Sequence, residues 1–246
     1  MHRELAGARA WVIGASSGIG AALADELVRR GARVAISARR RAELEDVGSG
    51  RMHVEPVDVT DADATKAAAD GVLTALGGID VVVISVGVWE PVNVDSWSPA
   101  TIREQLEVHV LGYAHVIDAV LPRMLADRRG TIVGVASVAA YRGLPGGAGY
   151  STAKAGLVAM LESMRAELLG RGVDVVTVCP GFVRTRAARP NQLWMIEPED
   201  AARRIADGIA SGKTEIVFPR PMMLVMKAAR LVPVRVWPRI AARFGR

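Results

Sequence analysis

The run AWVIGASSGIGAALADELVRR, residues 10–30, decides the fold of this chain. It predicts a short buried strand, a turn with three glycines and a helix that Gly31 closes. This order of elements is typical of the first βα unit of a parallel sheet. Glycines in such a turn let the backbone approach a pyrophosphate, and the helix offers its free N–H groups. The GxxxGxG spacing differs from the common GxGxxG fingerprint, so a plain tight turn is the alternative interpretation.

Strand and helix patterns alternate along the rest of the chain. Further strands are predicted at residues 33–37, 52–57, 81–84, 131–137, 173–178 and 215–218, and helices at residues 61–76, 99–125, 150–170 and from 197 onward. We therefore expect an α/β fold, a Rossmann-type doubly wound parallel sheet of seven strands with helices on both faces. Its ligand crevice should lie at the carboxyl ends of the strands.

Arginines follow the second predicted strand, in the order Ala38, Arg39, Arg40, Arg41. In a dinucleotide site an acid at this place binds the ribose 2′-OH, whereas an arginine accommodates a 2′-phosphate. Arg39 therefore favours NADP over NAD. A solvated basic helix start is the alternative, but basic residues are unfavourable there without an anion.

A second group of residues predicts proton-transfer chemistry. Tyr150 and Lys154 stand four apart in GYSTAK, which places both on one face of a helix, and Ser137 ends the preceding strand. A phenol needs its pKa lowered by roughly 3 units to exchange protons at neutral pH, and an ammonium group supplies part of that shift. Ser137 would hold the reacting oxygen by a hydrogen bond. An ordinary surface pair is the alternative for Tyr150 and Lys154.

Five motifs together resemble the short-chain dehydrogenase/reductase family over residues 8–220, namely GASSGIG, Asp58-Val59, Ser137, YSTAK and PGFVRT. The resemblance implies that Tyr150 is the acid/base, that Lys154 holds the cofactor ribose and lowers the tyrosine pKa, and that Ser137 orients the substrate oxygen. It implies a homodimer or homotetramer built on the long helix and the tyrosine helix. It also assigns these residues to the cofactor: Gly14, Ser16, Ser17, Gly18, Ile19, Gly20, Asp58, Val59, Gly87, Pro180, Gly181, Val183 and Thr185, together with Tyr150 and Lys154.

Three positions depart from the family pattern. After the fourth predicted strand the chain reads Ser85-Val86-Gly87, so only the glycine of the usual Asn-Asn-Ala-Gly is kept. His109 stands where an asparagine usually positions a water in the long helix. It could keep that water, carry the proton itself because its ordinary pKa is near ~6.5, or simply be packed. Ser17 replaces the basic residue that some NADP-preferring members carry.

Composition limits the other possibilities. The chain has 246 residues, of which half are hydrophobic, and a single cysteine, Cys179, which gives neither a disulfide nor a metal-site pattern. The first apolar run leads into a turn rather than a cleavage site, and no apolar stretch approaches the ~20 residues of a spanning helix, so we expect a cytoplasmic protein. Residues 1–220 should form one catalytic domain, with residues 221–246 as its extension.

The positive charge is concentrated in the tail. After Glu215 there are seven basic residues and no acidic one, so the body is slightly acidic and no nucleic-acid partner is expected. Residues 222–244 interleave basic and apolar side chains, with Pro233 and Pro238 allowing only short helices. This pattern fits either a peripheral membrane contact or packing on a partner subunit.

The apolar residues Leu193, Trp194, Met195 and Ile196 predict a small lid over an apolar substrate. We expect an NADP-preferring oxidoreductase that interconverts a carbonyl and a secondary alcohol. The alternative is a catalytically weak dinucleotide-binding protein with a regulatory or scaffolding role.

Overall fold

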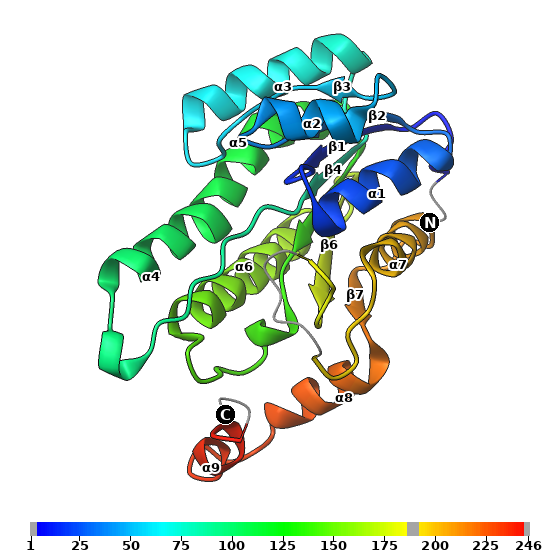
Figure 1. The fold of residues 1–246 in the computed structure, drawn as a ribbon. Coiled ribbons are helices and arrows are strands. Elements are labelled where there is room, and N and C mark those ends of the chain that lie inside the picture. Colours follow the sequence, from blue (N-terminus) through cyan, green and yellow to red (C-terminus); the bar gives the residue numbers. More distant parts are fainter. Residues whose placement is uncertain (1–3, 186–191, 244–246) are drawn as a thin grey trace.

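The computed structural model describes residues 4–185 and 192–243, and the strands in these residues form one parallel sheet (Figure 1). The sheet order is β3-β2-β1-β4-β5-β6-β7, which confirms the predicted fold class. The strands are β1 (Arg9–Ile13), β2 (Arg33–Ser37), β3 (His53–Val54), β4 (Val81–Ile84), β5 (Gly130–Val135), β6 (Val173–Pro180) and β7 (Glu215–Phe218). The strand order reverses between β1 and β4, where a doubly wound sheet opens its crevice.

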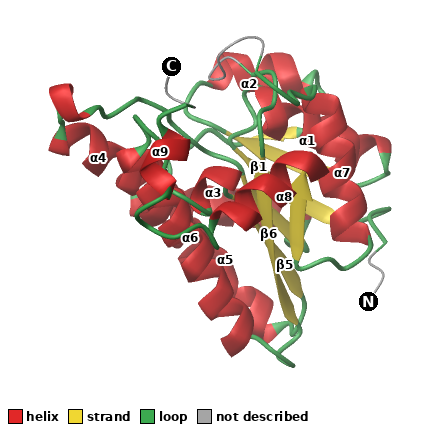
Figure 2. Ribbon diagram, turned by 90° about the horizontal axis from the view of Figure 1, so that it is seen from below, coloured by secondary structure: helices red, strands yellow, loops and turns green. Residues whose placement is uncertain are grey.

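Successive residues of the central strands face opposite layers of helices. Trp11 and Ile13 of β1 pack into one hydrophobic core, whereas Val12 packs into the other. The first core is covered by α3 (Ala62–Leu76), α5 (Gly112–Ala126) and α6 (Ala148–Glu167). The second is covered by α1 (Gly18–Arg29), α2 (Arg41–Gly48) and α7 (Pro198–Ala210). Figure 2 shows α5 and α6 on one side of the sheet and α1 and α7 on the other.

Two predicted elements differ from the structure for physical reasons. The strand expected at residues 52–57 is reduced to His53–Val54, because the register pairs Val54 with Ile36 and β2 ends one residue later, at Ser37. The amides of Glu55 and Val57 still donate to β2 and its end. The long helix expected at residues 99–125 is divided into α4 (Pro99–Leu106), the π-helical η2 (Glu107–Leu111) and α5. A π segment inside a helix is frequently found at functional sites.

The tail forms two short helices, as its prolines predict. They are α8 (Arg220–Ala229) and α9 (Trp237–Ala241), at the lower end of the molecule in Figure 1. Met222 and Met226 of α8 are buried in the first core, so the tail packs on the body. Short 3-10 turns, η1 (Val94–Ser96) and η3 (Val138–Ala140), complete the described elements. Over residues 4–185 and 192–243, no helix combines the length and apolar character needed to cross a bilayer.

Candidate active site

A cavity of about 390 Å³ lies where the carboxyl ends of β1, β2, β4 and β5 meet. Its size is in the range of small-molecule and cofactor sites. The predicted site residues that line it are Gly14, Ser16, Ser17, Gly18, Ile19, Gly20, Arg39, Asp58, Val59, Gly87, His109, Tyr150, Lys154 and Thr185. The structure thus brings the glycine turn, the arginine cluster and the Tyr150/Lys154 pair to one place.

The glycine turn has no room for side chains. Gly14 has φ +86°, and a Cβ on it would lie 2.6 Å from the backbone carbon of Ser85. A Cβ on Gly20 would overlap the carbonyl oxygen of Gly14, and one on Gly18 would lie 2.9 Å from Thr185 Cγ2. Only glycine allows this close passage of β1, the turn and α1.

The residues present fit a dinucleotide. Ser17 is the N-cap of α1, and its side chain makes no cap hydrogen bond in the described structure. The first N–H groups of α1, at residues that line the cavity, are therefore free to bind an anion. Arg40 and Arg41 form ion pairs with Glu43 and Glu45. Arg39 is exposed, lines the cavity and has no ion pair within the described ranges. It is therefore the arginine available to a 2′-phosphate.

Lys154 is hydrogen-bonded to the last residue of β5. Its Nζ donates a hydrogen bond of 2.8 Å to the carbonyl oxygen of Val135 and lies 5.8 Å from the Tyr150 ring centroid. The side chain is buried, and this burial lowers the pKa of Lys154 to about 7. A bound group that accepts a hydrogen bond from this ammonium would favour its charged form.

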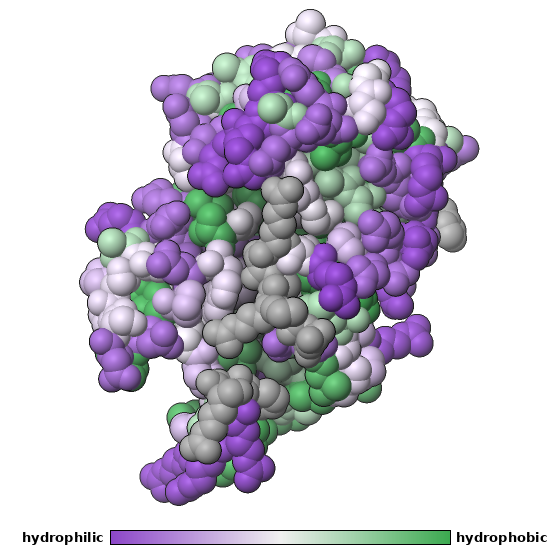
Figure 3. All heavy atoms as spheres, in the orientation of Figure 1, coloured by the Kyte–Doolittle hydropathy of each residue, from purple (hydrophilic) through white to green (hydrophobic). Residues whose placement is uncertain are grey.

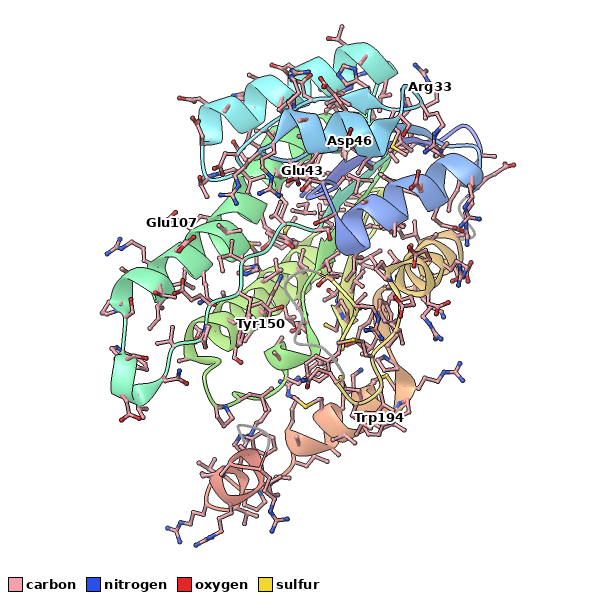
Figure 4. The ribbon with its side chains drawn as sticks, viewed as in Figure 1. Arg33, Glu43, Asp46, Glu107, Tyr150 and Trp194 are labelled. Carbon is pink, nitrogen blue, oxygen red and sulfur yellow. The ribbon has the colours of Figure 1, made fainter. Side chains whose placement is uncertain are left out.

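Tyr150 points from α6 into the middle of the molecule, toward the crevice (Figure 4). Burial raises the pKa of Tyr150, and a hydrogen bond with Ser137 offsets part of that rise. The sequence predicted a pKa lowered by Lys154. In the structure of the protein alone, desolvation dominates, because Lys154 directs its ammonium to Val135 and contacts the ring rather than the hydroxyl.

Two aromatic side chains contact the Tyr150 ring edge to face. Trp89 has its ring centroid 5.0 Å away at 86°, and His109 has its centroid 5.3 Å away at 84°. His109 lies in the π segment, is fully buried, and places Nε2 2.8 Å from the carbonyl oxygen of Val88. Burial, reinforced by the Lys154 charge, lowers the pKa of His109 to about 3. His109 is therefore neutral at physiological pH, which excludes it as a cationic acid there.

The second ring nitrogen of His109 has no partner. Nδ1 is buried and makes no hydrogen bond to any described residue. Nε2 lies 2.8 Å from the carbonyl oxygen of Val88 and 3.3 Å from its amide nitrogen, and the tautomer in which Nε2 donates across the shorter contact leaves Nδ1 as an acceptor beside Tyr150. That is the property needed to hold a water or a donor in the crevice.

Trp89 and Tyr113 are site residues that the sequence analysis missed. Trp89 lines the cavity, and the hydroxyl of the buried Tyr113 donates 2.9 Å to the carbonyl oxygen of Val135, the acceptor that Lys154 also uses. Burial raises the pKa of Tyr113 well above its ordinary value, so it stays a neutral donor. Tyr113 stands four residues after His109 on the same helix face, a spacing that could have identified it.

The remaining predicted residues lie beside the cavity. Ser137 caps η3, with its Oγ accepting from the amide of Ala139 at 3.1 Å. Pro180, Gly181 and Val183 do not line the cavity: Pro180 ends β6, Gly181 donates to Phe218, and Val183 pairs with Ile196.

In the predicted lid, Leu193 and Trp194 are exposed, with φ +59° at Trp194. Residues 186–191 of that segment, and Phe244 and Arg246 of the tail, lie outside the described residues. No cluster of three metal-ligating side chains occurs in the described part of the chain.

Comparison with known proteins supports the same assignment. The family model for short chain dehydrogenases matches residues 8–195. An uncharacterized oxidoreductase of Myxococcus xanthus is 36% identical, with 98% of each chain covered. The 17-beta-hydroxysteroid dehydrogenase 13 of Rattus norvegicus is 30% identical, covering 96% of this chain and 82% of the relative.

A short chain dehydrogenase from Burkholderia cenocepacia, solved in complex with NADP, superposes with a TM-score of 0.83 at 26% identity, covering 94% of this chain and 100% of that one. Sequence and structure thus agree over nearly the whole length. The chain belongs to the short-chain dehydrogenase/reductase family and is an NAD(P)-dependent oxidoreductase of that family.

Proposed function

We propose that this protein interconverts a carbonyl and a secondary alcohol on an apolar substrate and prefers NADP. The observation that carries the proposal is that one cavity joins the glycine turn, Arg39, Tyr150 and Lys154, with Ser137 hydrogen-bonded to Tyr150 beside it. A protein that only bound a dinucleotide would need the first two features and not the third.

Residues of this chain would perform the proton chemistry, with the bound nicotinamide supplying or accepting the hydride. In the reducing direction Ser137 donates a hydrogen bond to the substrate oxygen, and Tyr150 transfers its hydroxyl proton to that oxygen as the C=O becomes C–OH. The raised pKa of Tyr150 keeps it protonated before the transfer. Charged Lys154 would then stabilise the phenolate left behind, and Trp89 would exclude water from this side of the ring.

The cofactor-binding residues follow from the lining of the cavity. We assign the phosphates to Gly14, Ser16, Ser17, Gly18, Ile19 and Gly20, the adenine to Asp58 and Val59, the 2′-phosphate to Arg39, and the nicotinamide side to Gly87 and Thr185. Residues 180–183, which do not line the cavity, join the nicotinamide side in this proposal because they lead directly to Thr185. NADP in the Burkholderia cenocepacia structure supports this preference. The matching observation in this chain is that Arg39 lines the cavity and has no ion pair among the residues that the structure describes.

An apolar substrate is supported by the side chains around the entrance. Trp89, Phe182, Leu193 and Trp194 are all exposed there or on the neighbouring loop. The name of the rat relative adds polycyclic alcohols to the candidates. We further infer a cytoplasmic homodimer or homotetramer that uses the α5 and α6 side, with residues 1–220 as one catalytic domain and 221–246 as its extension.

The test is a panel of carbonyls and alcohols, with long-chain and polycyclic members, assayed with NADPH and with NADP. Tyr150→Phe should abolish turnover while leaving cofactor affinity within a few-fold, because the ring is kept and only the proton is lost. Turnover that survives in Tyr150→Phe would remove Tyr150 from the mechanism. Cofactor binding without turnover anywhere in the panel would instead favour the regulatory or scaffolding alternative.

A further inference from the structure

Helix α8 has three distinct sides. Met222, Met226 and Ala229 face the core and are buried. Leu224 is 63% exposed, and the exposed Ala228 follows it by one turn on the same side of the helix; Leu231, in the turn directly after the helix, is 87% exposed. A helix that only completed the fold would need the first side and not an outward apolar one.

Basic residues form the third side and continue along the tail. They are Arg220, Lys227, Arg230, Arg235, Arg239 and Arg243, all exposed. Lys227 bonds to Glu215 at 2.5 Å, while the five arginines have no ion pair within residues 192–243 or 4–185. Exposed Val234, Val236 and Ile240 lie among them. Figure 3 shows hydrophobic and hydrophilic side chains next to each other over α8 and α9.

Two hydrogen bonds and a cation–π contact hold the tail against the rest of its own chain. Trp237 Nε1 donates 2.9 Å to the carbonyl oxygen of Gly143, and Arg142 donates 3.1 Å to that of Val232. The Arg142 guanidinium also lies 5.3 Å from the Trp237 ring centroid. These bonds attach the tail to the body while its apolar and basic side chains remain exposed. We call these exposed residues the tail surface: Arg220, Leu224, Ala228, Arg230, Leu231, Val234, Arg235, Arg239 and Ile240.

We propose that the tail surface binds the face of a lipid bilayer that carries anionic headgroups. Apolar side chains would enter the interface and the arginines would contact the headgroups, the arrangement of an interfacial amphipathic helix. Charge decides between this occupant and a second copy of the chain. An isologous contact places the same patch on both sides, so it would bring the acid-free basic surfaces together.

The tail surface lies at the end of the molecule where the substrate of the proposed reaction would enter. This step depends on the proposed function. The loop that holds the tail, residues 141–143, follows Ser137 and η3 directly. Gly181 contacts Met222 of α8, so the exposed Phe182 lies next to the tail, and Trp194 lies above α8 in Figure 4. A bilayer beneath α8 would therefore bring an apolar substrate to the same end of the molecule as the lid.

The test is cosedimentation of the full chain with vesicles of phosphatidylglycerol mixed with phosphatidylcholine, and with vesicles of phosphatidylcholine alone, at low and high salt. The tail variant is Arg230→Gln, Arg235→Gln, Arg239→Gln. The matched control removes the same charge elsewhere, as Lys66→Gln, Arg171→Gln, Arg204→Gln, at exposed positions with no side-chain bond within the described structure. A third variant, Leu224→Ser with Leu231→Ser, removes exposed apolar side chains without changing the charge.

We expect the intact chain to bind the anionic vesicles only and to be released by salt. The tail variant should lower the vesicle partition coefficient about 100-fold, the loss that three basic residues near an anionic surface imply, and the control only a few-fold. The serine variant should also lose binding. Light scattering should give one particle size for all, and equal thermal midpoints would show that the variants fold.

Three results would overturn the proposal. Equal losses in the tail and control variants, or no binding by the intact chain, would refute a dedicated lipid surface. Smaller particles for the tail variant, without vesicle binding by the intact chain, would assign the tail to a partner subunit. Activity in detergent-free buffer is a separate readout, so the proposed reaction can stand or fail independently.

Discussion

Lys154→Met tests the electrostatics of the crevice without any substrate. Burial lowers the pKa of Lys154 from 10.5 to about 7 in the folded protein, while the unfolded chain keeps the ordinary value. Between these two values the unfolded state binds more protons than the folded state. The free energy of unfolding must therefore rise with pH across this window, and the lysine is destabilising below it.

The size of the effect follows from the shift. A fully developed difference of one proton is worth about 1.4 kcal/mol for each pH unit. Between about pH 7 and about pH 9 the folded lysine goes from half protonated to neutral, so the gain should be about 2 kcal/mol. Methionine has a similar length and no charge, so this gain should be missing in Lys154→Met.

The assay is urea denaturation of both proteins without cofactor, at several pH values in that window and constant ionic strength. Other titrating groups cancel in the difference between the two curves. Burial raises the pKa of Cys179 to about 11, and Cys179 is present in both proteins. Stability curves that run parallel from about pH 7 to about pH 9 would refute the lowered pKa of Lys154.

Two further substitutions test individual roles. Arg39→Asp should reverse the preference from NADPH to NADH, changing the ratio of kcat/KM values about 10- to 100-fold, since a charge-assisted bond is worth ~1.5 to 3 kcal/mol. Arg41→Asp is its control, because Arg41 already pairs with Glu45, and equal effects of the two would place the 2′-phosphate elsewhere. His109→Asn should keep kcat within a few-fold and His109→Leu should lower it about 100-fold, because a neutral hydrogen-bonding group is what the site uses. A titration of kcat near the ordinary histidine pKa of about 6.5 that is present in the unmodified protein and disappears in His109→Asn would contradict this role.

The sheet could be predicted wherever the sequence carries its own boundaries. β2, β4 and β7 have the predicted bounds, since each is a short apolar run between glycine, polar or proline residues. β3 could not be bounded in this way. It is an edge strand that pairs with β2, so the residue at which it ends depends on its pairing with β2. The hydrophobic pattern of the sequence does not show this pairing.

The π segment that interrupts the long helix could not be predicted from the sequence pattern either. Residues 107–111 have ordinary helical composition, and nothing in their spacing predicts a π turn. Glycines lie where this part of the helix meets neighbouring loops. A Cβ on Gly112 would lie 2.6 Å from Val59 Cγ2, and one on Gly87 would lie 2.8 Å from His109 Cε1. The helix therefore passes close to the loops after β3 and β4 at the π segment, and the sequence pattern does not show this approach.

The proposed catalytic group could be predicted from the sequence, whereas its surroundings, which depend on this close approach, could not. Ser137, Tyr150 and Lys154 come from adjacent elements with a local spacing, so their convergence follows from strand and helix geometry. Trp89 and His109 reach Tyr150 from a loop and a π segment whose paths depend on packing across the sheet. His109 stands where the family usually has an asparagine, and Trp89 adds an indole against the same tyrosine ring. Differences between this protein and its relatives in substrate choice and pH dependence should therefore be sought at Trp89 and His109 rather than at Tyr150 itself.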